Sequence, residues 1–208
     1  MNTVHSRMRR RFLVGGLSAL GVAAITPAAL RALVADGRGE FQFAGDAMGS
    51  TYSVRFVAPR SEALLPQAAR AAVDRAIAAV DASMSTFAPE SEITRLNVQR
   101  AERAFALSAD AFAVLTAAHD VSDATQGAFD ITAGPLVNAW GFGPDRHPRI
   151  PSLRERALLR ERVGFRGLEL DASARTVRKS HPGMYVDLSG IAKGYAADRA
   201  AAALNALG

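Results

Sequence analysis

The order in which strand-like and helix-like segments follow one another is the feature that most restricts the fold of this chain. Composition and alternation predict strands at residues 41–43, 51–58, 104–107, 168–170, 176–179 and 184–188. Apolar residues at helical spacing predict helices over residues 64–83, 92–97, 108–126, 152–163 and 191–207. Strands and helices do not alternate regularly, so the pattern predicts an α+β fold and not a parallel α/β fold.

Local signals place several helix boundaries. The apolar face of the first predicted helix consists of Ala69, Val73, Ile77 and Val80. Ser108 is expected to cap the start of the next long helix, and Gly127 to occupy its C-terminal stop position. Ser152 and Glu155 form the capping-box pattern that begins another helix.

The positive charge of the chain is concentrated at its N-terminus. The formal net charge is +5, and no acidic residue precedes Asp36, whereas five arginines do: Arg7, Arg9, Arg10, Arg11 and Arg31. Of the 25 Lys and Arg residues, 20 therefore follow this segment, against 20 Asp and Glu residues. The body of the protein has no excess positive field for a phosphate backbone, and we expect no binding to nucleic acid.

The arginine-rich start has the pattern of an export signal. Arg9-Arg10-Arg11-Phe12-Leu13 fits a twin-arginine signal, and a moderately apolar stretch follows to about Leu30. Positive charge before that stretch keeps the N-terminus cytoplasmic and places the rest outside. We assign residues 1–35 to a twin-arginine-type signal or anchor and residues 36–208 to one folded domain. The expected location is the periplasm, with an inner-membrane anchor if the signal stays uncleaved.

Three glycine-containing segments have compositions that suit ligand binding. The first is Met48-Gly49-Ser50-Thr51-Tyr52, for which an ordinary β-turn is the alternative interpretation. The second runs from Gly127 to Gly143 and combines a carboxylate, a hydroxyl and aromatic rings, which a flat heteroaromatic ligand requires. A loop packed on itself, with Trp140 as its anchor, is the alternative there.

The third segment joins a predicted strand to the last predicted helix. It reads Val186-Asp187-Leu188-Ser189-Gly190-Ile191-Ala192-Lys193-Gly194-Tyr195 and places Lys193 in the first helical turn. Free N–H groups at a helix start and a nearby ammonium group suit a phosphate or pyrophosphate. Lys193 is one of two lysines against 23 arginines, which favours a role for its compact charge. An ordinary capping arrangement is the alternative.

Together these segments resemble the ApbE family of FAD:protein FMN transferases. The resemblance also includes Ser85-Thr86-Phe87 and Ser91-Glu92-Ile93-Thr94-Arg95-Leu96-Asn97, and the segments follow the family's order from about Phe41 onward. It implies an ApbE-like (T-fold-like) mixed sheet with packed helices and a flavin-binding domain. It further implies Mg²⁺-dependent transfer of FMN from FAD to a Thr or Ser hydroxyl of a target flavoprotein, with release of AMP.

The resemblance also implies which residues form the site. FAD would be held by Met48, Phe87, Ala128, Phe129, Asp130, Asp187 and Lys193. Phe87 stands where the family often has Tyr, so stacking is kept and a hydroxyl contact is not. Asp187 and Lys193 would hold the ribose and phosphate portion. The Gly190 carbonyl would be a ligand of Mg²⁺, which takes oxygen ligands. The sequence identifies no catalytic residue.

The resemblance ends before the family's pattern does. Family members continue through a His-x-x-Asp-Pro segment and an Asp-containing helix that supplies metal ligands, and nothing in residues 1–208 matches either. We therefore expect the C-terminal part of the domain to be missing and this chain alone to transfer FMN poorly. The alternatives are a non-catalytic FAD-binding remnant or carrier, or an FAD pyrophosphatase. The expected partners are FAD and an acceptor flavoprotein of a membrane redox complex.

Overall fold

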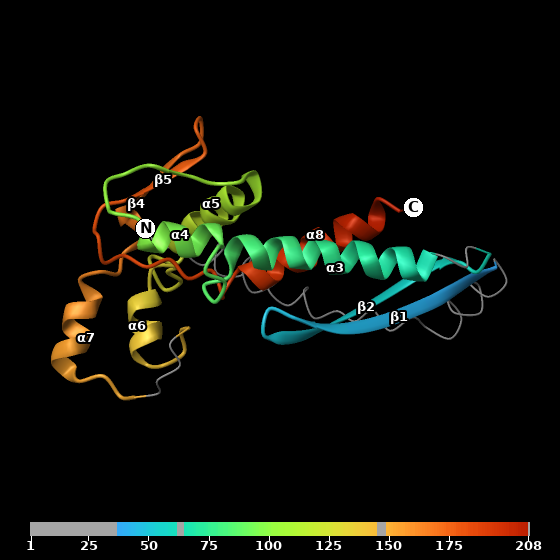
Figure 1. The fold of residues 1–208 in the computed structure, drawn as a ribbon, viewed down its shortest axis with the longest axis horizontal. Helices are drawn as coiled ribbons and strands as arrows, with labels where there is room; N and C mark the ends of the chain where they lie inside the picture. The colour runs from blue at the N-terminus through green and yellow to red at the C-terminus, as the bar shows by residue number, and fades with distance from the viewer. Residues whose placement is uncertain (1–36, 62–64, 145–148, 208) are drawn as a thin grey trace, which may run out of the picture. The chain divides into compact units, whose positions relative to one another are not determined.

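The computed structural model describes residues 37–61, 65–144 and 149–207. Its elements are β1 (Arg38–Ala47), β2 (Ser50–Pro59), α3 (Leu65–Met84), α4 (Glu92–Val98), β3 (Phe105–Ala106), α5 (Ala109–Ala124), α6 (Gly134–Ala139), α7 (Leu153–Arg160), the 3₁₀ helix η2 (Phe165–Gly167), β4 (Leu168–Asp171), β5 (Thr176–Lys179) and α8 (Ala192–Asn205) (Figure 1). Helices and short strands mix without regular alternation, which confirms the predicted α+β class. The predicted signal or anchor at residues 1–35 lies outside the described residues.

The chain divides into two compact units. The first comprises residues 1–41 and 55–63, of which the described part is the open end of the β1–β2 hairpin. There the rings of Phe41 and Phe56 stack with centroids 5.5 Å apart, and Arg55 Nε lies 2.9 Å from Glu40 Oε1. The second unit comprises residues 42–54 and 64–208 and contains the candidate site.

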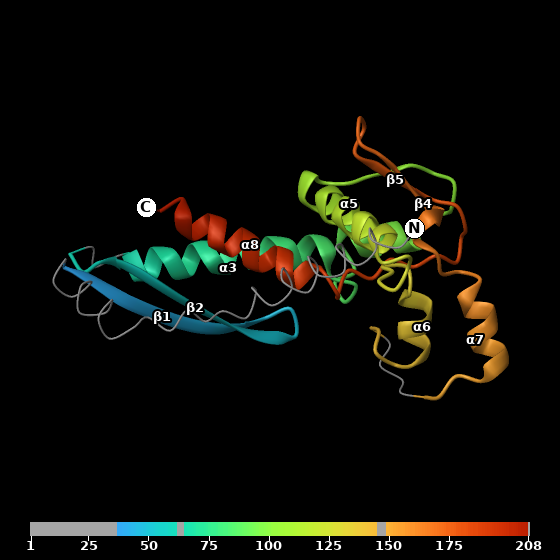
Figure 2. The same cartoon turned by 180° about the vertical axis from the view of Figure 1, so that it is seen from behind.

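Two helices of the second unit, α3 and α8, lie side by side in both ribbon views (Figures 1 and 2). The apolar face predicted for α3 is buried at all four positions, Ala69, Val73, Ile77 and Val80. Val73 and Ile77 pack in one cluster with Ala200 of α8. This packing places the start of α8 near the end of α3.

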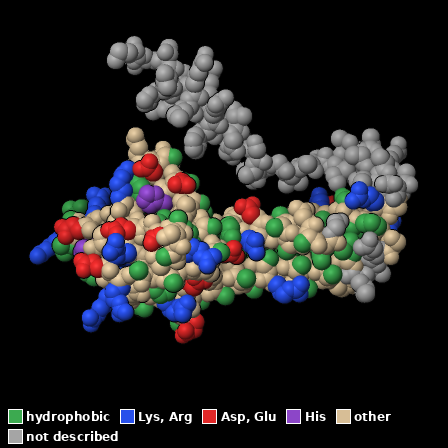
Figure 3. All heavy atoms as spheres, turned by 90° about the horizontal axis from the view of Figure 1, so that it is seen from above, with side chains coloured by type: hydrophobic (Ala, Val, Ile, Leu, Met, Phe, Trp, Pro, Cys, Tyr) green, Lys and Arg blue, Asp and Glu red, His purple; other side chains and the backbone are tan. Residues whose placement is uncertain are grey.

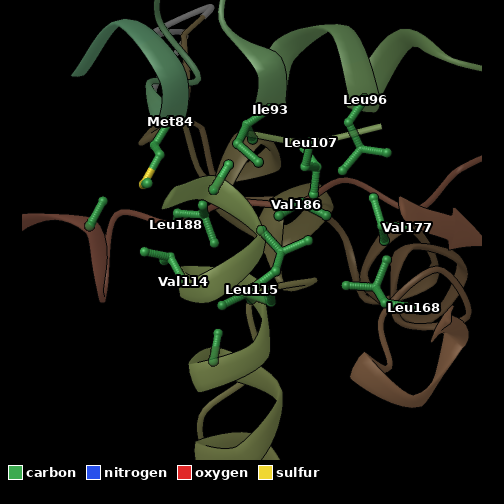
Figure 4. Close-up of a cluster of buried hydrophobic side chains, with 14 of the residues drawn as sticks. Met84, Ile93, Leu96, Leu107, Val114, Leu115, Leu168, Val177, Val186 and Leu188 are labelled. Carbon is green, nitrogen blue, oxygen red and sulfur yellow. The ribbon is translucent and has the colours of Figure 1, made fainter. Parts of the chain in front are cut away.

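The main core of the second unit lies where α4, α5, the small sheet and residues 184–188 meet. Figure 4 shows Leu96 of α4, Leu115 of α5 and Val177 of β5 in this cluster, together with Val186 and Leu188. Each of these five side chains is at most 1% exposed. Residues 184–188 therefore bury alternate side chains, as a strand would.

The structure differs from the prediction in how residues 184–188 are bonded. The sheet is antiparallel in the order β3–β5–β4. In the described chain, residues 184–188 join no strand ladder, and Tyr185 forms one isolated parallel bridge with Ala133. The predicted strand is wrong because the side-chain amide of Asn97, and not a neighbouring strand, bonds both the N–H and the C=O of Val186.

Two further local predictions need correction. The end of α5 is a Schellman motif in which Gln126, and not Gly127, is the first residue after the C-cap Thr125; both residues have left-handed φ, 56° and 82°. Its bonds run from Gly127 N–H to Ser122 O (2.8 Å) and from Gln126 N–H to Asp123 O (3.0 Å). The loop predicted after Gly127 also contains a short helix, α6, with Pro135 in its first turn.

The surface carries charges of both signs. In the face shown in Figure 3, basic and acidic side chains are interspersed, in keeping with the balanced charge of the residues after the N-terminal segment. Over residues 37–61, 65–144 and 149–207, no helix has the length and apolar character that a membrane crossing requires.

Candidate functional site

The turn between β1 and β2 presents Met48 in an unusual backbone conformation. Met48 and Gly49 both have left-handed φ, 51° and 68°, as in a type I′ hairpin turn. The left-handed region suits glycine but costs a residue such as Met about 1–2 kcal/mol. The Met48 side chain is half-buried and packs against both apolar clusters of the second unit, which offsets that cost.

A pocket of about 390 Å³ opens beside this turn, within the range typical of small-molecule sites. It is lined by Met48, Gly49, Asp81, Met84, Ser85, Thr86, Phe87, Ser189, Ala192 and Lys193. The hairpin turn, the end of α3, the loop after it and the start of α8 all contribute. Three predicted site residues that are far apart in the sequence, Met48, Phe87 and Lys193, therefore line one pocket.

A second cavity, also of about 390 Å³, adjoins the first and shares Met48 and Asp81 with it. Tyr52, Arg70 and Asp74 line its other side. The Tyr52 hydroxyl donates a hydrogen bond to Asp74, and this bond is the main reason why the pKa of Tyr52 is raised. The two cavities together offer room for an elongated ligand that extends past Met48.

The loop that carries Phe87 is held by hydrogen bonds around Ser91. The Ser91 hydroxyl caps α4 by accepting from Thr94 N–H (3.0 Å) and donates to the Ser85 carbonyl (2.6 Å). Phe87 N–H in turn donates to the Ser85 hydroxyl (3.3 Å). Ser91 is 1% exposed, whereas Phe87 is 49% exposed, so a fixed loop presents an aromatic ring that a ligand can reach.

Lys193 lies in the first turn of α8 and is exposed. The N-cap residue, Ile191, makes no side-chain hydrogen bond to the first-turn N–H groups. Because Lys193 lies at the start of α8, its ammonium group and the positive end of the helix dipole act at the same place, which suits an anionic group. Asp81, on the end of α3, brings a negative charge to the same pocket.

The start of α8 is anchored to α5 through Tyr195. Its hydroxyl donates to Asp110 Oδ1 at 2.8 Å. Burial raises the pKa of Tyr195, and the hydrogen bond to Asp110 raises it further. The hydroxyl thus stays protonated and keeps this bond up to strongly alkaline pH.

The Asp130 carboxylate is engaged within its own loop. Its Oδ1 accepts from the N–H (2.7 Å) and the hydroxyl (2.6 Å) of Thr132, and its Oδ2 accepts from Phe165 N–H (3.0 Å). The fully buried Thr132 hydroxyl also accepts from Gly164 N–H (2.7 Å). The structure thus gives this side chain a role in shaping the loop, and the ligand contact predicted for Asp130 stays a prediction.

Three other predicted residues, Phe129, Asp187 and Gly190, form a second group beside the pocket. Asp187 donates its N–H to Ile131 O (2.8 Å), and its Oδ1 accepts from the N–H (2.9 Å) and hydroxyl (2.5 Å) of Ser189. The ring of Phe129 lies against Gly190. Ser189 lines the pocket, so the loop before α8 joins the two groups. Ala128 is exposed and lines none of the cavities described above.

Several residues of the pocket were not predicted. Ser85, Thr86 and Ser189 belong to segments that the sequence singled out, and their hydroxyl groups were a usable signal. Asp81 had a weaker signal, a carboxylate that follows directly on the buried Val80 of α3.

The metal prediction rests on the Gly190 carbonyl alone. Within the part of the chain that the structure describes, no three His, Asp or Glu side chains are grouped so that they could hold a metal ion. One carbonyl is far from the roughly six oxygen ligands that Mg²⁺ takes. The described residues therefore do not amount to a magnesium site.

Comparison with known proteins agrees with this arrangement. The model of the ApbE family matches residues 48–208. The chain is 35% identical over 160 residues to the FAD:protein FMN transferase of Vibrio cholerae and 35% identical over 167 residues to that of Haemophilus influenzae. These alignments cover 76% and 78% of this chain but 47% and 48% of the relatives. The chain thus spans about half the length of the curated relatives that it matches.

Solved structures show the same relationship. The flavin transferase ApbE from Vibrio cholerae superposes with a TM-score of 0.74 at 33% identity, over 81% of this chain and 54% of that one. The apo flavinyl transferase ApbE of Pseudomonas stutzeri superposes with a TM-score of 0.72 at 30% identity, over 82% of this chain and 54% of that one. The family match and the shared fold show that this chain belongs to the ApbE family.

Proposed function

We propose that this protein is an FAD:protein FMN transferase that binds FAD in the pocket lined by Met48, Phe87 and Lys193. FMN would pass to a Thr or Ser hydroxyl of an acceptor flavoprotein, and AMP would leave. The names of its relatives, FAD:protein FMN transferase, support the transfer of a flavin group. The single observation that carries the proposal is the meeting of these three distant side chains in one pocket.

The chemistry of the pocket supports a ligand with a flat apolar part and an anionic part. The exposed ring of Phe87 and the thioether of Met48 are suited to contact an isoalloxazine or adenine ring. The Lys193 ammonium group and the positive end of the α8 dipole suit the pyrophosphate. FAD contains both parts, and the adjoining cavity beyond Met48 provides room for an extended dinucleotide.

The reaction breaks the pyrophosphate of FAD. The acceptor hydroxyl oxygen attacks the phosphorus on the flavin side and releases its proton to solvent. The bond from this phosphorus to the bridging oxygen breaks, so AMP leaves with that oxygen. The Lys193 ammonium group would offset the charge that develops on the phosphate oxygens. Mg²⁺ would neutralise further phosphate charge if other ligands complete its coordination, and the Gly190 carbonyl is the one ligand that we propose for it in this chain.

We also propose that the protein acts outside the cytoplasm, either free in the periplasm or anchored to the inner membrane. The twin-arginine pattern at Arg9-Arg10 supports export, and the apolar stretch that follows supports an anchor if it is retained. Acceptors would then be flavoproteins of membrane redox complexes.

A direct test combines FAD binding with transfer. The purified protein is titrated with FAD, and is then incubated with FAD, Mg²⁺ and an acceptor flavoprotein. We expect saturable FAD binding and slow transfer, which gives a weakly fluorescent acceptor band on a denaturing gel and one AMP for each flavin attached. Free FMN and AMP without a labelled acceptor would indicate a pyrophosphatase instead. A folded protein that binds no FAD would refute the proposal.

A further inference from the structure

The side chain of Asn97 makes the two backbone hydrogen bonds that a neighbouring strand would otherwise make to Val186, in the segment that leads to the pocket. It lies near the end of α4, and its Oδ1 accepts from Val186 N–H at 2.7 Å while its Nδ2 donates to Val186 O at 2.9 Å. Val186 is fully buried, so both of its backbone groups need partners. The Asn97 amide satisfies both, and the position of Val186 therefore depends on the position of Asn97.

Lys179 fixes Asn97 from the other side. Its side chain is 1% exposed, and its Nζ donates to the Asn97 carbonyl oxygen at 2.8 Å. Among the described residues, no carboxylate lies within ion-pairing distance of this ammonium group. Burying a cation without an acidic partner is costly. A buried lysine here is hard to explain by stability alone.

The series of hydrogen bonds from Lys179 through Asn97 to Val186 leads to the pocket. Val186 is followed by Asp187, whose carboxylate bonds Ser189, and Ser189, Ala192 and Lys193 line the pocket. The two lysines of the chain thus lie at opposite ends of this series of contacts: Lys179 in the core and Lys193 in the pocket.

We propose that Asn97 and Lys179 are positioning residues for the pocket loop, residues 187–193. Lys179 holds the Asn97 backbone, the Asn97 amide holds Val186, and Val186 fixes where the loop begins. The inference deepens the proposed function and rests on it, because the group to be positioned is Lys193 toward the FAD pyrophosphate.

Asn97→Ala tests the proposal, with Gln99→Ala as the matched control. Gln99 lies two residues further on and its Nε2 donates to the Arg103 carbonyl (2.7 Å), so the control also loses a side-chain bond to the backbone but not the bonds to Val186. Two measurements are made on each folded variant: the Kd for FAD and hydrogen–deuterium exchange of backbone amides. For Asn97→Ala we expect faster exchange over residues 186–192 with α5 unchanged, and an FAD Kd raised about tenfold. Gln99→Ala should leave both as in the wild type.

If Asn97→Ala does not fold, Lys179→Met serves as a second variant. It keeps the approximate volume of the side chain and removes the buried charge. It should also raise exchange over residues 186–192. A purely structural role predicts exchange that rises equally in α5 and in residues 186–192, with an unchanged FAD Kd, and that outcome overturns the proposal. If the wild-type protein binds no FAD, the proposed function fails, while the exchange pattern still decides whether Asn97 holds the loop.

Discussion

Gly190 lies directly against the ring of Phe129. A methyl group on its α-carbon would stand 3.1 Å from Phe129 Cε2 and 3.9 Å from Cζ. The shorter of these distances is tighter than carbon atoms normally pack. The contact joins the loop after α5 to the loop before α8, two segments that the sequence assigned to one site.

Gly190→Ala should therefore move the ring or the loop. We expect a loss of about 1 kcal/mol in the free energy of unfolding, as for other overpacked sites, and weaker FAD binding. Gly194→Ala is the control, because a Cβ at this position in α8 would meet nothing within 4 Å. That variant should be as stable as the wild type or more stable by up to about 1 kcal/mol. Urea denaturation measures both, and equal stabilities of the two variants would contradict the contact.

Lys193→Ala should weaken FAD binding more than riboflavin binding. The ammonium group lines the pocket at the start of α8, and a charge-assisted contact to a pyrophosphate contributes about 1–3 kcal/mol. Riboflavin lacks the phosphates and should lose little. Arg199→Ala, which removes a cation further along α8 and outside the pocket, is the control. Fluorescence titration gives both affinities, and an equal loss for the two ligands would place Lys193 away from the pyrophosphate.

The fold was largely predictable where one local pattern decides the outcome. The apolar stripe of α3 and the predicted serine caps of α5 and α7 follow from side chains close in sequence. The strand predicted at residues 184–188 failed because its partner is a side chain, Asn97, 89 residues away. Gln126 and Gly127 both take left-handed φ, and the hydrogen bonds of the motif place Gln126 first, a distinction that composition alone does not reveal.

The site, like the fold, was predictable where the local sequence marks a residue. Met48, Phe87 and Lys193 stand in segments whose composition marks them, and the structure brings them to one pocket. Asp130 also stands in such a segment, and its carboxylate bonds Thr132 and Phe165 within the protein. Its contact with FAD stays a prediction.

Ser91→Ala and Ser152→Ala should differ in their effect on the pocket. Both serines cap helices, accepting from the N–H three residues on, and each loss should cost about 1 kcal/mol of stability. Only the hydroxyl of Ser91 also holds the carbonyl of Ser85, a pocket residue. Ser91→Ala should therefore weaken FAD binding, and Ser152→Ala should not. Thermal melts and FAD titrations of the two variants check this, and FAD binding that stays unchanged in Ser91→Ala would argue against the role of this bond.

Replacement of Arg9 and Arg10 by lysines should block export. The folded-protein route requires the arginine pair, whereas lysines keep the charge of the segment. A reporter fused after residue 35 should reach the periplasm with the native sequence and stay in the cytoplasm with the lysine pair. A reporter that is exported equally well with lysines would exclude this route.

Lys179 should make stability rise with pH in the alkaline range. Burial lowers the pKa of this ammonium group below its usual value of 10.5. Below the lowered pKa both the folded and the unfolded chain carry the proton, and the folded state bears the full cost of burying the charge. As pH rises through the lowered pKa, the folded side chain loses its proton first, so the unfolded state binds more protons and the free energy of unfolding increases until about pH 10.5.

Lys179→Met has no group that titrates at this position, so comparison with the wild type isolates the effect. Tyr52 and Tyr195, whose pKa values are raised, titrate alike in both proteins and cancel in the difference. The wild-type free energy of unfolding, minus that of Lys179→Met, should therefore increase from neutral pH toward pH 10.5 when measured by urea denaturation. Since the neutral amine can still donate to the Asn97 carbonyl, the gain comes from the lost charge and not from a lost hydrogen bond. A difference that stays constant over this range would mean that the Lys179 ammonium group is hydrated in solution.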